Sequence, residues 1–477
     1  MSDTYGATYT PSTIGQHGTW TAPELWKPKE RGFRFVRLVW VDYAGFTRYR
    51  VLPISYSDCI LASPRPGVAL ATLALGLVTL ALGLVFSTFP EGFGSNGENL
   101  FVPDTSTLRI ASYTEPVPSA PASISFGTPE LDSALCPRAL LKRVCDQATA
   151  QGVTFLIGFE IQFALLSSTN PITPVNEADW CVSRGLASGS PELKTLTAIA
   201  IALRDTGIEL QTFHSELLPG QMGFEVVTGP LTPLDSADAL IATREVIANV
   251  AASHGLRATF APRIYRDGPG SSSHAHISLH LTSPKPASGT PSLSDPERAF
   301  LASVIAHLPA LTALTLPTPS SHDRIRDGDH TRVEPGSRGE SQEHARCPSA
   351  CAVCPPRGTS SSSAGRHGQP IPRARGDARR GPEGDQRRDA ARGRAVRRRG
   401  AERAAMGRAG AEGDQGARAE QPMGSTEAFK RDGVVKEVLG EEIVSAYLTV
   451  HEALERAVQT EAGRLGGDGV RVMAENY

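Results

Sequence analysis

The chain has 477 residues and a formal net charge of −2, which allows two domains and provides no overall attraction for nucleic acid or an anionic membrane. Its seven cysteines are too sparse for a disulfide scaffold, so we expect a reducing, cytoplasmic location. Residues 1–26 are Thr-, Gly- and Ser-rich and lack a basic-then-apolar pattern. This composition is typical of a disordered arm rather than a signal peptide.

The first structured segment is predicted to be a β-hairpin. Residues 33–42 alternate apolar and polar side chains and end in the turn sequence Asp42-Tyr43-Ala44-Gly45, and residues 47–52 form the second strand. These strands would begin a small domain over residues 31–110.

Residues 67–89 carry no charge and are long enough to span a bilayer. Two interpretations remain open, a membrane span and a buried core segment with a local duplication. The abundance of Ala, Gly and Thr, and the absence of a following Lys/Arg cluster, favour the buried segment.

From residue 137 the pattern changes to alternating helices and strands. Helices are predicted where a helix-spaced pattern of apolar residues begins at Pro or an acidic residue and ends at Gly. Strands are predicted between these helices. The helices are expected at residues 137–151, 191–206 and 235–254, and the strands at 154–166, 208–214 and 257–264. This order predicts an α+β domain whose sheet exposes one half-polar face.

Three motifs place acidic and imidazole groups on these strands. Glu160 lies in Gly-Phe-Glu-Ile-Gln-Phe, Glu216 follows Thr-Phe-His-Ser, and His274, His276 and His280 alternate so that they share one face. Each residue alone is more typical of a sheet wall or surface position. Together, in this order and at these separations, the motifs resemble those of the glutamine synthetase family.

The resemblance implies a small N-terminal β-grasp domain followed by a catalytic domain with a curved antiparallel sheet. It also implies a ligase that activates the γ-carboxylate of glutamate with ATP as a γ-glutamyl phosphate and then forms an amide with ammonia or a small amine. Divalent cations favour such phosphoryl transfer because they neutralise phosphate oxygens, which calls for a carboxylate-lined site.

By this resemblance, Glu160 and His274 would hold Mg²⁺ or Mn²⁺ near the ATP phosphates, and Glu216 and Glu225 would hold the metal near the glutamate carboxylate. The remaining site residues would bind substrates: His276 and Ser278 would line the nucleotide region, and Gly270 and Arg324 would bind glutamate. The family's homo-oligomeric rings are expected as well.

Two departures from the family pattern fall on these motifs. Gln162 stands where the family has a second glutamate, which replaces an anionic ligand with a neutral amide. Met222 and Gly223 look like an insertion in the family's Gly-Gln-x-Glu, and Glu225 keeps its face because the insertion is even. A catalytically decayed structural protein is therefore the alternative function.

Residues 333–421 lose the family pattern and become rich in Arg, Ala, Gly and Ser. Such a segment cannot bury enough apolar area to fold, so a disordered, nucleic-acid-binding tail is one interpretation. A frame disturbance is the interpretation we favour, because the next frame would restore a family-like motif. Cys347, Cys351 and Cys354 have the spacing of an iron–sulfur motif, but unpaired thiols are the simpler explanation.

The predicted domain order is thus an arm (1–30), a β-grasp domain (31–110), a catalytic domain (111–332), the low-complexity segment (333–421) and a C-terminal helical part of the catalytic domain (422–477).

Overall fold

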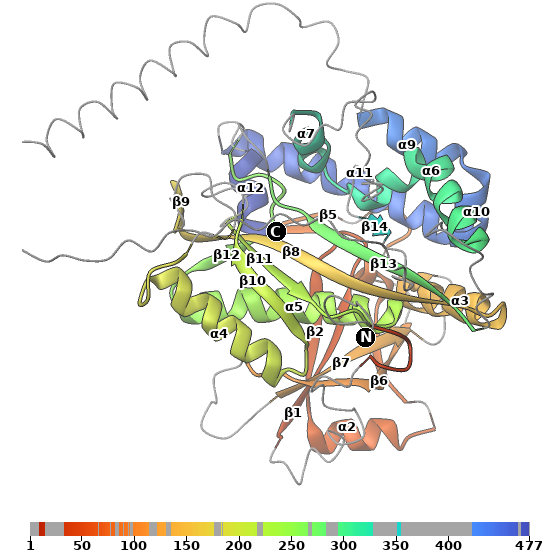
Figure 1. Cartoon of the computed structure of the whole chain (residues 1–477), viewed down its shortest axis with the longest axis horizontal. Helices are drawn as coiled ribbons and strands as arrows, with labels where there is room; N and C mark the ends of the chain where they lie inside the picture. The colour runs from red at the N-terminus through yellow and green to blue at the C-terminus, as the bar shows by residue number, and fades with distance from the viewer. Residues whose placement is uncertain are drawn as a thin grey trace, which may run out of the picture. The chain divides into compact units, whose positions relative to one another are not determined.

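The alternating segment at the N-terminus folds as the predicted hairpin in the computed structural model (Figure 1). β1 (Phe35–Val41) pairs antiparallel with β2 (Thr47–Pro53). The carboxylate of Asp42 closes the turn by accepting the backbone N–H groups of Ala44 and Phe46, both at 3.0 Å. Gly45 completes it with φ +82°, a value that an L side chain rarely adopts.

The structure describes residues 9–14, 33–64, 66–76, 78–81, 85–88, 90–93, 95, 99–113, 122–129, 135–175, 183, 185–216, 223–265, 270–282, 294–327, 351–353, 422–465 and 469–476. The arm over residues 1–30 lies mostly outside these ranges. So does the segment 333–421, apart from the backbone of β14 (Cys351–Val353). Apart from the backbone of Cys351, the cysteine motif and the predictions for the Arg-rich segment therefore concern undescribed residues.

A five-stranded mixed sheet forms the N-terminal domain, in the order β2-β1-β7-β6-β3, with β1 and β7 parallel. Helix α2 (Ile54–Leu61) contacts β1 and β2. This agrees with the predicted β-grasp architecture. The remaining strands are β3 (Val68–Leu70), β6 (Asn99–Ile110) and β7 (Ala122–Pro129).

The charge-free segment folds as short elements rather than one long helix. They are β3, a 3₁₀ helix (Thr72–Leu75), β4 (Val78–Ala81) and β5 (Val85–Thr88), with β4 and β5 paired as a hairpin. Leu70 and Leu75 are buried in the core that joins the N-terminal sheet to the C-terminal helices. The burial of Leu70 and Leu75 agrees with the buried-segment interpretation, whereas Ala69 is exposed.

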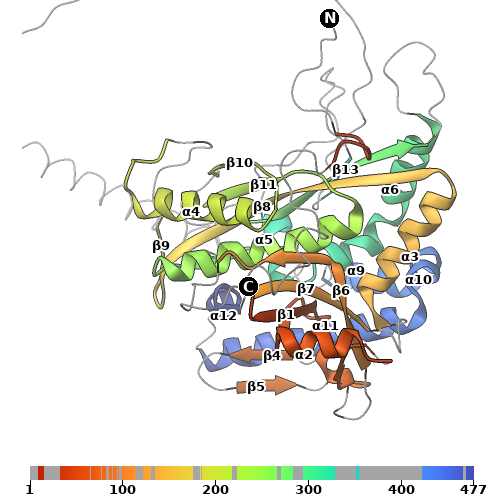
Figure 2. The same cartoon turned by 90° about the horizontal axis from the view of Figure 1, so that it is seen from below.

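The second sheet has β8 (Val153–Thr169) at its centre, in the order β10-β11-β8-β13-β14, with β9 and β12 also paired to β8 (Figure 2). Alternation along β8 separates its two faces. Ile161, Phe163 and Leu165 are buried among residues of α4 (Pro191–Asp205) and α5 (Pro233–Ser253). Glu160 and Gln162 point to the opposite face, which carries the candidate site.

The other strands of this sheet are β9 (Ile172–Pro174), β10 (Leu210–Ser215), β11 (Phe224–Thr228), β12 (Arg257–Thr259) and β13 (Ser273–Leu281). Their pairings are antiparallel except for β13 with β14. The predicted strand 257–264 is too long. After Thr259, Pro262 has no N–H to donate, and its carbonyl instead accepts the N–H of Ser271 at 3.0 Å, so the chain leaves the ladder.

The predicted helices form with boundaries close to those expected. α3 (Pro137–Ala150), α4 and α5 each begin with Pro in the first turn, where the missing N–H costs nothing. The α5 helix ends just before Gly255, whose φ is +71°. These signals are local, which explains why the sequence predicted them well.

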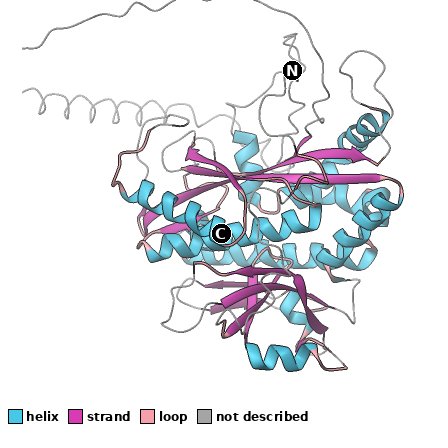
Figure 3. Ribbon diagram, turned by 60° about the horizontal axis from the view of Figure 1, so that its bottom comes forward, coloured by secondary structure: helices cyan, strands magenta, loops and turns pink. Residues whose placement is uncertain are grey.

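Helices from the two ends of the catalytic part pack together (Figure 1; all helices are cyan in Figure 3). Ala310 and Ala313 of α6 share a core with Phe429 and Val444. The elements concerned are α6 (Asp295–Thr315), α7 (Pro319–Asp327), α9 (Pro422–Arg431), α10 (Gly433–Leu439), α11 (Glu441–Arg464) and α12 (Gly469–Asn476). Among described helices, α6 alone is long and apolar enough to cross a bilayer; a single helix of this kind is weak support for a span.

Arg138 of α3 connects the N-terminal sheet to α5. Its guanidinium donates to Asp104 of β6 at 2.7 Å and to both carboxylate oxygens of Asp238 at 2.9 and 3.2 Å. Burial raises the pKa of Asp238 even though Arg138 opposes the shift.

Candidate active site

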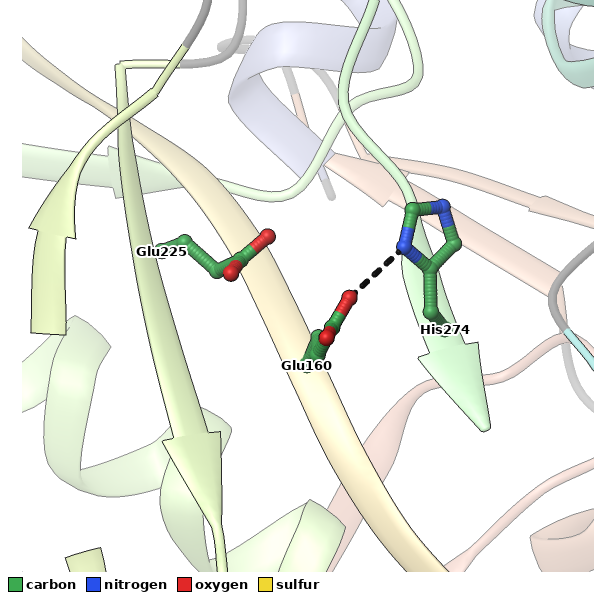
Figure 4. A group of neighbouring side chains, drawn as sticks. All are labelled: Glu160, Glu225 and His274. Carbon is green, nitrogen blue, oxygen red and sulfur yellow. Dashed lines mark hydrogen bonds and ion pairs between the residues drawn. The ribbon is translucent and has the colours of Figure 1, made fainter. Parts of the chain in front are cut away.

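Cross-strand register brings the predicted acidic and imidazole groups onto one face of the second sheet. His274 on β13 lies opposite Glu160 on β8, and Gln162 on β8 lies opposite Glu225 on β11. Figure 4 shows Glu160 and His274 joined by a hydrogen bond, with Glu225 on the neighbouring strand. Ligand atoms of these three residues lie within 4.8 Å of one another.

Glu160 is shared by two imidazoles. One carboxylate oxygen lies 3.0 Å from Nδ1 of His274, and the other lies 2.9 Å from Nε2 of His276, at ion-pair distance although not in hydrogen-bond alignment. The contacts with His274 and His276 hold the pKa of Glu160 well below its usual range, and Glu160 in turn raises the pKa of His276. The two imidazoles therefore favour the ionised form of the Glu160 carboxylate.

Glu225 is almost buried and has different neighbours. Its Oε2 accepts a hydrogen bond from the amide of Gln162 at 3.0 Å, and its Oε1 lies 3.2 Å from Nε2 of His214. Nδ1 of the same imidazole lies 3.4 Å from Oε2 of Glu216. His214, Glu216 and Glu225 thus form a second group whose ligand atoms lie within 4.8 Å of one another.

Gly223 sets the position of Glu225, although the sequence suggested that it was an insertion. Its φ is +64°, and a Cβ there would lie 2.7 Å from the carbonyl oxygen of Phe163 on β8. Glu216 donates its backbone N–H to the carbonyl of Gly223 at 3.0 Å. The predicted face of Glu225 is confirmed, because Glu225 lies opposite both His214 and Gln162.

Gly270 and Arg324 lie together, beside rather than within the acidic groups. A Cβ on Gly270 would lie 1.8 Å from the carbonyl oxygen of Pro262 and 2.9 Å from Cδ of Arg324, so only glycine allows this approach. Burial, followed by the nearby charge of Arg263, lowers the pKa of Arg324.

Arg324 lines a cavity of about 490 Å³ that reaches the site through Gln162 and Ser272. The rest of its wall is mainly apolar and includes Leu316, Leu439 and Tyr447. A cavity of this size and lining suits a small organic ligand.

Ser278 is not brought to the acidic groups. It lies four residues beyond His274 on β13, opposite Leu156, and its hydroxyl is 2.9 Å from Nε2 of His280. It shares a face with His274 and His276, as the alternation predicted, but contacts neither Glu160 nor Glu225 among the described interactions.

Sequence reasoning missed His214 and Ser272 as site residues. His214 precedes Glu216 by two positions on an extended segment, and this spacing was the available signal for a shared face. For Ser272 there was no such signal. Its N–H and hydroxyl donate to Oε1 of Gln162 at 2.9 and 3.0 Å, and its hydroxyl also lies 2.8 Å from Nε2 of His274.

Comparison with known proteins supports the resemblance noted in the sequence. Residues 134–335 match the family model described as "Glutamine synthetase, catalytic domain". The match ends two residues beyond the start of the Arg-rich segment at 333.

Two curated relatives extend the comparison. Protein fluG of Emericella nidulans is 33% identical over 310 residues, which cover 62% of this chain and 33% of fluG. Gamma-glutamylpolyamine synthetase GlnA3 of Streptomyces coelicolor is 29% identical over 353 residues, which cover 66% of each protein. The chain thus spans between a third and two thirds of these relatives.

The crystal structure of a glutamine synthase homologue has a similar fold, with a TM-score of 0.60 and 22% identity over 93% of this chain and 99% of that one. At this level of identity the likeness concerns the fold.

Proposed function

Because residues 134–335 match the catalytic domain of glutamine synthetase, we propose that the chain is a cytoplasmic ATP-dependent ligase that joins the γ-carboxylate of glutamate to an amine. Ammonia is the acceptor favoured by the family description, and a larger amine is favoured by the similarity to a gamma-glutamylpolyamine synthetase. Both reactions would pass through a γ-glutamyl phosphate.

The observation that carries this proposal is the group of carboxylates and imidazoles on one sheet face. Its oxygen-rich donors suit Mg²⁺ or Mn²⁺, which would bind within the set Glu160, Glu216, Glu225 and His274. A bound cation would neutralise phosphate oxygens of ATP. Unchanged metal affinity in both Glu216→Ala and His274→Ala variants would remove this assignment.

The chain's own residues would orient the substrates. His276 lies beside Glu160 at the proposed phosphate region, and Ser278 continues the same face of β13. Arg324, held against Gly270, offers a half-buried cation for the carboxylate of glutamate. The apolar part of the adjoining cavity offers space for an amine larger than ammonia.

The decisive test measures ADP release by the purified full chain with ATP, Mg²⁺ and glutamate. We expect release that depends on glutamate and rises when ammonium, a monoamine or a polyamine is added. The acceptor giving the highest kcat/KM identifies the amine class. A Glu216→Ala variant is expected to lose this activity.

One observation favours a second function, that of a catalytically decayed structural protein. Gln162 supplies a neutral amide where the family has a second glutamate, so the site has one anionic ligand fewer. A folded chain that releases no ADP with any of these acceptors would support this alternative.

We also propose assembly into homo-oligomeric rings. The edge strand β2 exposes Tyr49 and Val51 by 50% and 49%, and Tyr56 of α2 is 57% exposed. Apolar side chains exposed on an edge strand and on the helix that follows it are typical of an interface. Sedimentation should show a large particle, and a well-dispersed monomer would contradict this proposal.

The proposed domain division assigns residues 333–421 to a frame disturbance rather than to a nucleic-acid-binding tail. Sequencing the transcript across residues 331–421 would distinguish these origins.

A further inference from the structure

The cavity beside the acidic groups connects residues of the site with an apolar wall. Gln162, Ser272 and Arg324 belong to the site, whereas Ile443 and Leu454 come from α11. These two apolar residues are 6% and 3% exposed and pack in the core that α11 shares with the N-terminal sheet. Close packing holds such a wall in shape, so the cavity can select its occupant by size and polarity.

Charge is unevenly distributed over this wall. Two cations, Arg244 and Arg324, line the cavity. Among the described lining residues, Asp42 is the one carboxylate, and its side chain is 0% exposed. The Asp42 carboxylate is also ion-paired with Arg48. An ammonium group inside the cavity would therefore meet no exposed carboxylate on the described part of the wall.

Other groups of the wall do not replace a carboxylate. Hydroxyl oxygens such as those of Thr315 and Thr318 can solvate an ammonium group but cannot neutralise its charge. The ring of Tyr447 attracts a cation, but this attraction is weaker than the loss of hydration that accompanies burial of an unpaired charge. A group that stays positively charged is therefore disfavoured in this cavity.

The proposed reaction requires an uncharged acceptor nitrogen. A neutral primary amine would attack the γ-carbonyl carbon of γ-glutamyl phosphate and form a C–N bond. The C–O bond to the phosphate breaks, the phosphate leaves with the electron pair of that bond, and the proton lost by the nitrogen passes to the phosphate. Burial favours the neutral amine because it disfavours the ammonium form. A polyamine would bring a second ammonium group to the apolar wall, whereas ammonia would leave most of the cavity to water.

We infer that the acceptor is a primary monoamine with an apolar chain, which packs against Leu439, Ile443 and Leu454. The inference rests on the proposed ligase function and specifies its acceptor class. Glutamate would share the cavity, with its carboxylate paired to the half-buried Arg324.

The first test compares amines by their kcat/KM for ADP release, measured on the purified full chain with saturating ATP, Mg²⁺ and glutamate. From methylamine to pentylamine, we expect a rise of about fourfold for each added methylene, because each one leaves water for the apolar wall. Cadaverine is the matched control, since it is pentylamine with a second amino group at the far end. Its kcat/KM should be lower than that of pentylamine by about tenfold or more. The value for ammonium should also lie below that for pentylamine.

A carboxylate placed in the wall tests where the apolar chain binds. Leu439→Glu changes a half-buried lining residue of α10 and should raise the ratio of kcat/KM for cadaverine to that for pentylamine by about tenfold or more. Val438→Glu makes a matched change at the neighbouring residue, which is 50% exposed and is not among the lining residues, and should leave this ratio unchanged. Circular dichroism checks that each variant folds. If Leu439→Glu does not fold, Leu439→Phe reduces the cavity instead and should lower kcat/KM for pentylamine more than for methylamine.

Equal kcat/KM for cadaverine and pentylamine, or no rise from methylamine to pentylamine, would overturn the inference and leave the proposed ligase standing. The highest kcat/KM with ammonium would have the same meaning. An unchanged amine preference in a folded Leu439 variant would overturn the assigned position. Absence of ADP release with every amine would overturn both the ligase and the inference.

Discussion

Arg138 offers a direct test of how the N-terminal sheet is held to the catalytic part. It bonds Asp238 of α5 with two hydrogen bonds and Asp104 of β6 with one. The Asp238 side chain is 6% exposed and that of Asp104 is 29% exposed. Arg138→Met preserves most of the side-chain volume and removes the charge, so the main cost arises from Asp238.

Breaking a buried ion pair on one side costs about 3–5 kcal/mol, because the remaining charge stays buried without its partner. Lys142 is the matched control on the same helix. The ion pair of Lys142 with Asp146 has the same 2.7 Å separation as that of Arg138 with Asp104. The side chains of Lys142 and Asp146, however, are 64% and 63% exposed. Such exposed pairs contribute about 0–1 kcal/mol, so Lys142→Met should have little effect.

Urea unfolding, followed by circular dichroism, measures the free energy of unfolding that each of the two variants loses. The loss caused by Arg138→Met should become smaller as the pH falls through the folded-state pKa of Asp238. That pKa is raised by burial, so the folded state takes up a proton before the unfolded chain does. Asp238→Asn combined with Arg138→Met should restore part of the stability. A deficit below about 1 kcal/mol, equal to that of Lys142→Met, would refute the argument.

Three further changes test other parts of the structure. Burial lowers the pKa of the His451 imidazole to about 4, so the unfolded chain takes up a proton at this residue before the folded chain does. About 2–3 kcal/mol of stability should therefore be lost as the pH falls from about 6.5 to about 4. The His451→Gln variant should show a flatter pH dependence in acid unfolding. Gly223→Ala should lower the melting temperature more than Gly255→Ala, because both have positive φ but only Gly223 meets a backbone oxygen, at 2.7 Å; equal effects would contradict this. Phe163→Ala should cost about 3–5 kcal/mol in urea unfolding, since the ring is fully buried, and a loss below about 1 kcal/mol would mean that the core collapses around the gap.

The site was predicted in part. Glu160, Glu225 and His274 come together as expected, because the period of two along each strand determines which side chains share a face. Ser278 shares that face but lies too far along β13 to reach the carboxylates. Alternation specifies the face of a residue, whereas the register of the neighbouring strand decides its partners.

The sequence by itself determined the local elements and the resemblance to the glutamine synthetase family. Helices α3, α4 and α5 begin and end close to the predicted residues because proline and glycine act through the backbone of their own segment. The length of β12 was mispredicted, since its end depends on a hydrogen bond between Pro262 and the later Ser271.

Only the tertiary structure decided how the site is organised. The contact of Gln162 with Glu225 spans 63 residues, and that with Ser272 spans 110. Neither contact has a local signal, because each depends on β11 and β13 pairing with opposite edges of β8. The sequence therefore identified Gln162 as a departure from the family, and the fold gave it specific partners, because hydrogen bonds depend on distances that only strand pairing sets.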